Sequence, residues 1–153
     1  MKTYKQPVSV LVVIYTQALE VLLLERADYA GYWQSVTGSR DGEEALRETA
    51  IREVLEETGI DARAHALTDW QEQNVYEIYP RWVHRYPPGT THNTEHVFGM
   101  ELPGRVAVQL SPREHLSHVW LPWQEAAEKV FSPSNRAAIL ELPKRAQARP
   151  RNV

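Results

Sequence analysis

The segment 52–60 constrains this chain more than any other part of its sequence. It reads Arg-Glu-Val-Leu-Glu-Glu-Thr-Gly-Ile and predicts a helix end, with Gly59 at the position where a left-handed residue commonly follows the last turn. At about 100° per residue, Glu53 and Glu57 lie one turn apart on one face, and Glu56 flanks them. Like charges at this spacing each destabilise an isolated helix by about 0.2–0.5 kcal/mol. Carboxylates in a last turn also oppose the helix dipole.

A hard divalent cation is the simplest compensation for this crowding. Carboxylate oxygens are the ligands of Mg²⁺ or Mn²⁺, and these ions bind substrate phosphates as well. A merely acidic, solvated helix face remains the alternative explanation.

The distribution of charge favours the cation. The formal net charge is −3, and residues 38–60 hold seven acidic residues against three arginines, a local net charge of −4. The other 130 residues carry 13 acidic and 14 basic side chains, a net of +1. An excess confined to one window predicts a local cation site, whereas a nucleic-acid-binding surface would show clustered basic residues.

Length and composition limit the number of domains and the kinds of site that this chain can have. A chain of 153 residues fits one domain. The absence of cysteine excludes a disulfide scaffold, a thiolate nucleophile and a Cys-based zinc or iron–sulfur site. The apolar run near the start, residues 8–15, is too short for a membrane span of about 20 residues. We therefore expect a cytoplasmic protein with neither membrane nor nucleic acid as a partner.

Hydrophobic patterning predicts strands followed by helices, which indicates a layered domain that mixes both. On the central helix, Ala50, Ile51, Val54 and Leu55 would supply the apolar stripe that packs on the sheet. A globular domain over 1–142 and a flexible basic tail over 143–153 are expected. Strands are predicted at 8–15, 21–26, 32–37, 96–102 and 119–121, with two more in 67–86 separated at Pro80, and helices at 44–58, 123–131 and 135–142.

The acidic helix belongs to a longer pattern. Gly38, Glu44 and the segment 52–60 match the Nudix box at all nine of its specified positions. The chain therefore resembles the Nudix hydrolases, which cleave substrates of the nucleoside-diphosphate-linked-to-X type. The resemblance implies an α/β/α sandwich around a mixed sheet. One departure is local: the glycine usually found just before the first box glutamate is displaced here to Gly42.

The resemblance also implies roles for the box residues. Glu53 and Glu57 would be the main metal ligands, and Glu56 would bind the metal or lie beside it. Gly38 would offer its backbone carbonyl, and Arg52 would orient the neighbouring carboxylate. Two or three Mg²⁺ ions, with Mn²⁺ as a substitute, would neutralise the polyphosphate while a water attacks phosphorus in line.

The general base in this family is often a glutamate outside the box. Two candidates follow from the sequence: Glu114, which would also contact the metal, and Glu95. An ordinary surface role is the alternative for each.

Outside the box, the chain resembles the branch of the family that converts dihydroneopterin triphosphate to its monophosphate and pyrophosphate in folate synthesis. The matching stretches lie at 4–15, 33–39, 84–89, 93–95 and 134–136. A pterin ring needs a flat aromatic slot with a few hydrogen bonds at its edge, and Trp33, Tyr76, Tyr79 and Trp82 are the nearest aromatics. The substrate-binding residues implied are Lys5, Arg26, Thr37, Tyr76, Glu77, Ile78, Tyr79, Ser132, Ser134 and Asn135.

Parts of the sequence also fit other functions. A Nudix enzyme acting on ordinary nucleoside triphosphates is the closest rival, and a non-catalytic nucleotide-binding module is the rival of a different class. Residues 92–96 spell the H-x-x-E-H signature of inverted zinc proteases, but that motif needs a helix and this segment predicts a strand. Residues 81–86 interleave basic and aromatic side chains, as single-stranded nucleic-acid binders do, yet strand alternation explains the pattern equally well. The sequence leaves the oligomeric state open.

Overall fold

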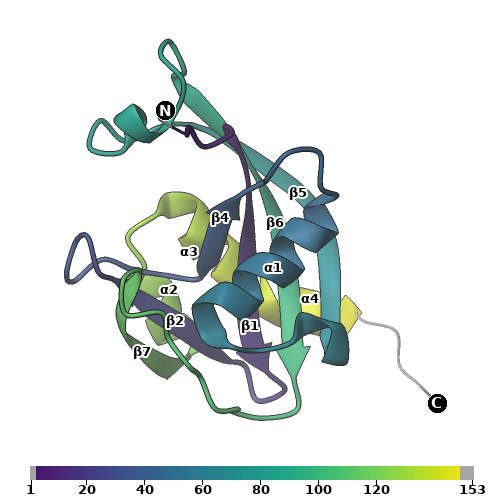
Figure 1. Cartoon of the computed structure of the whole chain (residues 1–153). Helices are drawn as coiled ribbons and strands as arrows, with labels where there is room; N and C mark the ends of the chain where they lie inside the picture. Colours follow the sequence, from purple (N-terminus) through teal and green to yellow (C-terminus); the bar gives the residue numbers. More distant parts are fainter. Residues whose placement is uncertain (1–2, 149–153) are drawn as a thin grey trace.

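The computed structural model describes residues 3–148, which form one mixed β-sheet between two helical layers (Figure 1). Helix α1 covers one face, and helices α2 and α3 cover the other. This confirms the expected α/β/α sandwich in a single domain. The strands are β1 (Val8–Thr16), β2 (Glu20–Arg26), β3 (Trp33–Gln34), β4 (Val36–Ser39), β5 (Ala66–Glu77), β6 (His92–Leu102) and β7 (His115–Pro122). The helices are α1 (Leu46–Thr58), α2 (Trp123–Lys129), α3 (Pro133–Leu140) and α4 (Leu142–Ala148), with short 3₁₀ turns η1 (Ala62–Ala64) and η2 (Val83–Arg85).

Strand β1 is the centre of the sheet. It pairs in parallel with β6 and antiparallel with β2 and β4, within the order β3-β2-β1-β6-β5. Val10, Val12 and Ile14 face the core under α1. Leu11 and Val13 face the core under α2 and α3. Burial on both faces explains the nearly continuous apolar run that the sequence shows here.

Helix α1 ends as expected, but its apolar stripe differs from the prediction. Gly59 follows the helix with a φ of 76°, in the left-handed region. Ala50, Ile51 and Val54 enter the core, whereas Leu55 is 53% exposed, so its assignment to the stripe was wrong. The helix also buries its Glu53–Glu57 face, and turning that face inward leaves Leu55 outside.

The segment after β5 also differs from the prediction of two strands within residues 67–86. Only the first strand, β5, is present, and the chain beyond Pro80 forms the turn η2. Tyr79 stacks on Trp82 with ring centroids 5.3 Å apart, and Phe131 packs against both rings. The alternation of aromatic residues therefore reflects an aromatic cluster, and strand alternation was the wrong explanation for residues 81–86.

Two smaller differences concern the ends of elements. The strand predicted at 32–37 is divided at Ser35 into β3 and β4. The segment expected to be a flexible tail from residue 143 starts within α4, where Arg145 lies 3.5 Å from Glu72. The rest of that tail, residues 149–153, lies outside the described residues, so its flexibility stays a prediction. No helix in residues 3–148 is both long enough and apolar enough to cross a membrane.

Candidate active site

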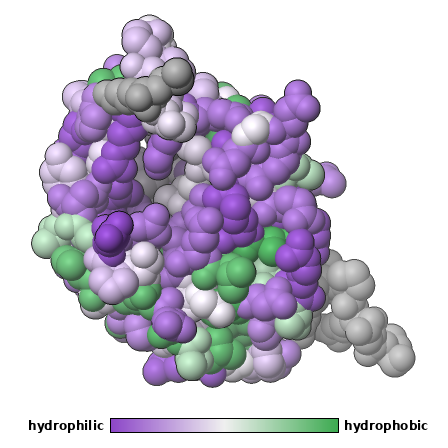
Figure 2. Space-filling model, in the orientation of Figure 1, coloured by the Kyte–Doolittle hydropathy of each residue, from purple (hydrophilic) through white to green (hydrophobic). Residues whose placement is uncertain are grey.

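A cavity of about 980 Å³ gathers most of the residues predicted from the sequence. It lies between the N-terminal segment, β4, the acidic face of α1, strands β5 and β6, and the loop that begins α3. Figure 2 shows this hollow with hydrophilic side chains around it. Among the residues to which the resemblance assigns a catalytic, metal-binding or substrate-binding role, Arg52 and Glu77 are the two that do not line it. Those that do are Lys5, Arg26, Thr37, Gly38, Glu53, Glu56, Glu57, Tyr76, Ile78, Tyr79, Glu114, Ser132, Ser134 and Asn135.

Gly38 and Glu53 are placed in direct contact. Gly38 lies on β4, facing α1, and a β-carbon added there would overlap all three atoms of the Glu53 carboxyl group. Glu53 is buried, and this burial raises the pKa of its carboxyl, against hydrogen bonds from Glu57 and Arg52 that lower it. The absence of a side chain at Gly38 is therefore what lets the carboxyl lie against the strand.

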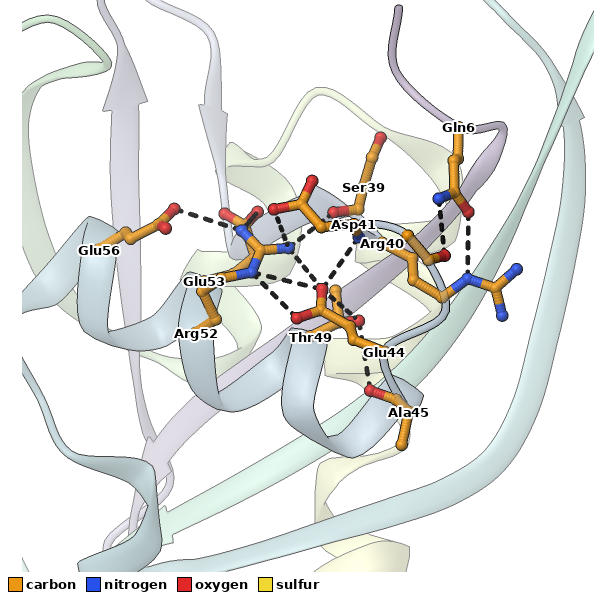
Figure 3. A network of polar contacts seen from close by, with 11 residues as sticks. Gln6, Ser39, Arg40, Asp41, Glu44, Ala45, Thr49, Arg52, Glu53 and Glu56 are labelled. Atoms are coloured by element: carbon orange, nitrogen blue, oxygen red, sulfur yellow. Dashed lines mark hydrogen bonds and ion pairs between the residues drawn. The ribbon is translucent and has the colours of Figure 1, made fainter.

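Arg52 lies behind this pair and connects the box residues to one another (Figure 3). Its Nη1 donates to Glu53 Oε1 at 2.9 Å. Its Nη2 donates to Glu44 Oε1 at 2.7 Å and to the backbone oxygen of Ser39 at 3.0 Å. Glu56 is 3.5 Å away. This geometry fits the orienting role implied for Arg52, which touches the carboxylates and not the cavity.

Glu44 has a defined place despite the displaced glycine. Its carboxylate accepts hydrogen bonds from the Asp41 backbone N–H and from Thr49 Oγ1, both at 3.0 Å. The hydrogen bond from Arg52 is the main reason that the pKa of Glu44 falls to about 2. Glu44 thus closes the turn before α1 and fixes Arg52.

Glu57 is the most deeply buried of the acidic residues, with 2% of its surface exposed. Its Oε1 has no hydrogen-bond partner and lies 3.6 Å from Nε2 of His115. Burial, and then Glu53 and Glu114, raise the pKa of Glu57 well above its ordinary value. Burial also lowers the pKa of His115 to about 4, so the imidazole is neutral at pH 7 and does not offset the carboxylates.

Positive side chains approach the carboxylates from the cavity. Lys5 remains solvent-exposed, but the protein atoms around its ammonium group and the nearby Arg85 lower its pKa, while Glu53 and Glu57 raise it. Arg26 stacks 4.3 Å from the ring centroid of Trp82. Both oxygens of Asp28 accept hydrogen bonds from the Arg26 guanidinium at 2.7 Å. Lys5 and Arg26 both line the cavity, where cationic side chains can contact an anionic ligand.

The loop that begins α3 provides the opposite wall. Ser132 caps this helix by accepting a hydrogen bond from the backbone N–H of Asn135. The Asn135 amide accepts from the Ser35 backbone N–H at 2.8 Å and donates to Ser35 Oγ at 3.0 Å. These two bonds fix the position of Ser35, the residue between β3 and β4. Thr37, on β4, donates its hydroxyl to the backbone oxygen of Val10 at 2.9 Å.

Comparison with known proteins decides the family. A model of the NUDIX domain matches residues 5–142. The chain belongs to the Nudix family.

Two similar proteins and one solved structure give the Nudix assignment more detail. Dihydroneopterin triphosphate diphosphatase of Escherichia coli K12 is 46% identical over 90% of this chain and 93% of that protein. The protein of the same name from Haemophilus influenzae is 41% identical over 91% and 89%. The solved structure of the E. coli dihydroneopterin triphosphate pyrophosphohydrolase matches with a TM-score of 0.86 and 45% identity, covering 92% of this chain and 97% of that one.

Membership of the Nudix family implies a divalent cation, and the donors present fit one. Glu57 Oε1 is a buried carboxylate oxygen without a partner, which is the donor type that Mg²⁺ prefers. Within residues 3–148, however, no three acidic or imidazole side chains already converge as a metal site. Arg52 instead holds Glu53 and Glu56. The ligand set therefore stays a prediction.

The two candidate bases, Glu114 and Glu95, lie in different surroundings. Glu114 is exposed at the cavity and close enough to Glu57 to raise its pKa. Glu95 is 4% exposed and lies on β6, where its partners are neutral side chains. Because β6 begins at His92, the H-x-x-E-H segment is a strand. The two histidines of that motif do not share a helical face, as expected.

Sequence reasoning missed several residues of the cavity wall. Phe131, Tyr86 and Arg85 line it, and no motif had indicated them in that role. Asn93 lines it with 1% of its surface exposed. The available signal was the pair Asn93 and Glu95, which lie two residues apart in the polar first half of β6 and therefore share a face. Trp33, one of the aromatics considered for the pterin slot, is not among the lining residues.

Proposed function

We propose that this Nudix hydrolase converts dihydroneopterin triphosphate to dihydroneopterin monophosphate and pyrophosphate with Mg²⁺ as cofactor. The observation that carries the proposal is the identity of 41–46% to proteins named for this activity, over about nine-tenths of each chain. The reaction belongs to folate synthesis. On the sequence alone, we propose that it takes place in the cytoplasm.

The cavity supports a substrate with a flat ring and a polyphosphate chain. Tyr79, Trp82 and Phe131 form its aromatic cluster, and aromatic faces bind planar rings by offset or edge contacts. Lys5 and Arg26 line the same cavity as the acidic face of α1, where phosphates would lie. One cavity thus combines ring-binding and phosphate-binding side chains.

The reaction needs a water, a base and neutralisation of the phosphate charge. When bound, Mg²⁺ supplies charge neutralisation and polarises the reacting phosphoryl group. We assign Glu53 and Glu57, with Glu56, Glu114 and the Gly38 carbonyl around them, as the residues that would hold it. Lys5 and Arg26 hold the phosphates in position.

Glu114 is the proposed base. Its exposed carboxylate lies at the cavity near Glu57 and accepts the proton of the attacking water. The water oxygen forms a bond to phosphorus as the bond to the bridging oxygen breaks, and pyrophosphate leaves without a covalent enzyme intermediate.

A substrate panel tests the proposal against the nearest rival. We expect kcat/KM for dihydroneopterin triphosphate to exceed that for each of the four common deoxynucleoside triphosphates, measured at saturating Mg²⁺. A clear preference for one of the nucleotides would reject the pterin substrate and leave the family intact. A lack of hydrolysis with every compound, despite tight binding, would favour a binding module.

A further inference from the structure

The cavity has a second polar region that the reaction chemistry does not use. Asn93 and Glu95 lie two residues apart on β6, so both side chains point to the same face, about 7 Å apart along the strand. Both line the cavity, yet they are only 1% and 4% exposed. Asn93 Oδ1 and Glu95 Oε1 are buried oxygens without a hydrogen-bond partner.

The orientation of Asn93 is fixed by its neighbours. Its Nδ2 donates to Ser9 Oγ at 2.8 Å and to the Tyr76 hydroxyl at 3.1 Å. Both amide hydrogens are therefore used, and the amide oxygen is the atom left free. Asn93 thus presents an acceptor to the cavity.

Glu95 adds a second acceptor beside it. Burial raises the pKa of this carboxyl, and the side chains of Ser134 and Asn74 act against that rise. Both of those neighbours are neutral. Buried polar atoms are nearly always paired in native proteins, so an unpaired carboxyl oxygen on a cavity wall indicates a ligand that supplies the missing N–H.

We propose that Glu95, with Asn93 beside it, binds the N–H edge of a 2-amino-4-oxo heterocycle and selects the ring of the substrate. The ring N–H and the adjacent amino group form two parallel hydrogen bonds to one carboxylate. This inference rests on the proposed function, because the dihydropterin ring carries that edge. Guanine carries the same edge, whereas hypoxanthine lacks the amino group.

The position of Glu95 argues for ring recognition and against a role in proton transfer. The acidic residues that raise the pKa of Glu57 are Glu53 and Glu114. The groups that act on Glu95 are neutral. Burial, and then the charge of Glu95, raise the pKa of Tyr76 at the β5–β6 wall. A ring held at this wall would leave its phosphate chain free to extend toward α1.

The test compares three substrates in the full-length enzyme with Mg²⁺: dihydroneopterin triphosphate, GTP and ITP. We expect the wild type to prefer GTP over ITP by about tenfold or more in kcat/KM, since a site built to pair a donor rejects the analogue that lacks it. Glu95→Gln should raise KM for GTP and for the pterin, retain hydrolysis of ITP, and bring the GTP/ITP ratio close to one. Glu128→Gln, an exposed carboxylate on α2, is the matched control and should keep the wild-type ratio.

Several results would overturn the inference. One is a wild type that does not distinguish GTP from ITP; another is a Glu95→Gln enzyme with an unchanged ratio. A third is an equal loss of kcat for all three substrates at constant KM, which would assign Glu95 to the chemical step. Calorimetric binding of GMP and IMP repeats the comparison without turnover. If the GTP/ITP ratio of Glu95→Gln falls to about one as expected but dihydroneopterin triphosphate is a poor substrate, the proposed function is wrong and the inference on ring recognition holds.

Discussion

The carboxyl group of Glu53 occupies the space where a side chain at Gly38 would begin. Strand β4 and helix α1 are therefore packed so closely at the candidate active site that only glycine fits. Glycine is usually discussed for its backbone freedom, but here its value is the close approach that it permits.

Gly38→Ala should displace Glu53 and reduce activity. A shift of about 1 Å in a positioned group can lower the rate by about 100-fold, and we expect a loss of kcat/KM of that order with the fold retained. Gly104→Ala is the control, because a β-carbon there meets nothing within 4 Å. Steady-state kinetics and circular dichroism on both variants check the prediction, and a fully active Gly38→Ala enzyme would contradict the close packing.

Glu57→Gln should remove most of the thermal stabilisation that Mg²⁺ gives to the folded protein. A ligand that binds the folded state raises the melting temperature, so millimolar Mg²⁺ should stabilise the wild type and have little effect on Glu57→Gln. Without the metal, the variant should be at least as stable as the wild type, because a neutral amide at this buried position is not repelled by Glu53 and Glu114. Thermal melts with and without Mg²⁺ test this. Glu48→Gln, exposed on α1, should keep the wild-type response to Mg²⁺.

Glu44 should stabilise the fold in a pH-dependent way. Its pKa is about 2 in the folded protein and near 4.5 when unfolded, so between these values the unfolded chain binds the extra proton and acid weakens the fold. Glu44→Gln should lower the free energy of unfolding at pH 7 by about 1.5–3 kcal/mol, the size of a hydrogen bond to a charged group. Urea titrations at pH 7, 5, 4 and 3 should show that difference shrinking below pH 5. A difference independent of pH would show that the Arg52 contact adds nothing.

Glu114→Gln should separate catalysis from metal binding. Removing a general base typically lowers the rate by about 10²–10⁴-fold, and we expect a fall in kcat of that size. The Mg²⁺ concentration for half-maximal activity should change much less, since Glu53 and Glu57 remain. An unchanged kcat would move the role of base to another residue.

Much of the fold was predictable from the sequence because local pattern and tertiary context agree. Burial explains the apolar strand β1 and the start of β2. The backbone preference of glycine explains why α1 ends at Gly59. Leu55 was assigned wrongly because apolar periodicity competes here with a face that buries carboxylates. Tyr79 and Trp82 were read as a strand because their aromatic–polar alternation does not reveal that the rings stack on each other across a turn.

The site was predictable where residues are close in sequence, as on α1. The cavity also depends on contacts between distant segments, such as Asn93 with Ser9 and Asn135 with Ser35. No local pattern encodes which buried oxygen remains unpaired once these contacts form. Which oxygens on β6 are left unpaired therefore becomes known only from the folded chain.

The most direct test of the central claim is the rate of pyrophosphate release from dihydroneopterin triphosphate, followed with Mg²⁺ and then with excess EDTA, for the wild type and for Glu53→Gln. We expect rapid release by the wild type with Mg²⁺, and a rate at least about 100-fold lower after chelation or in the variant. Near wild-type release by Glu53→Gln at saturating Mg²⁺, or release that survives EDTA, would contradict the account.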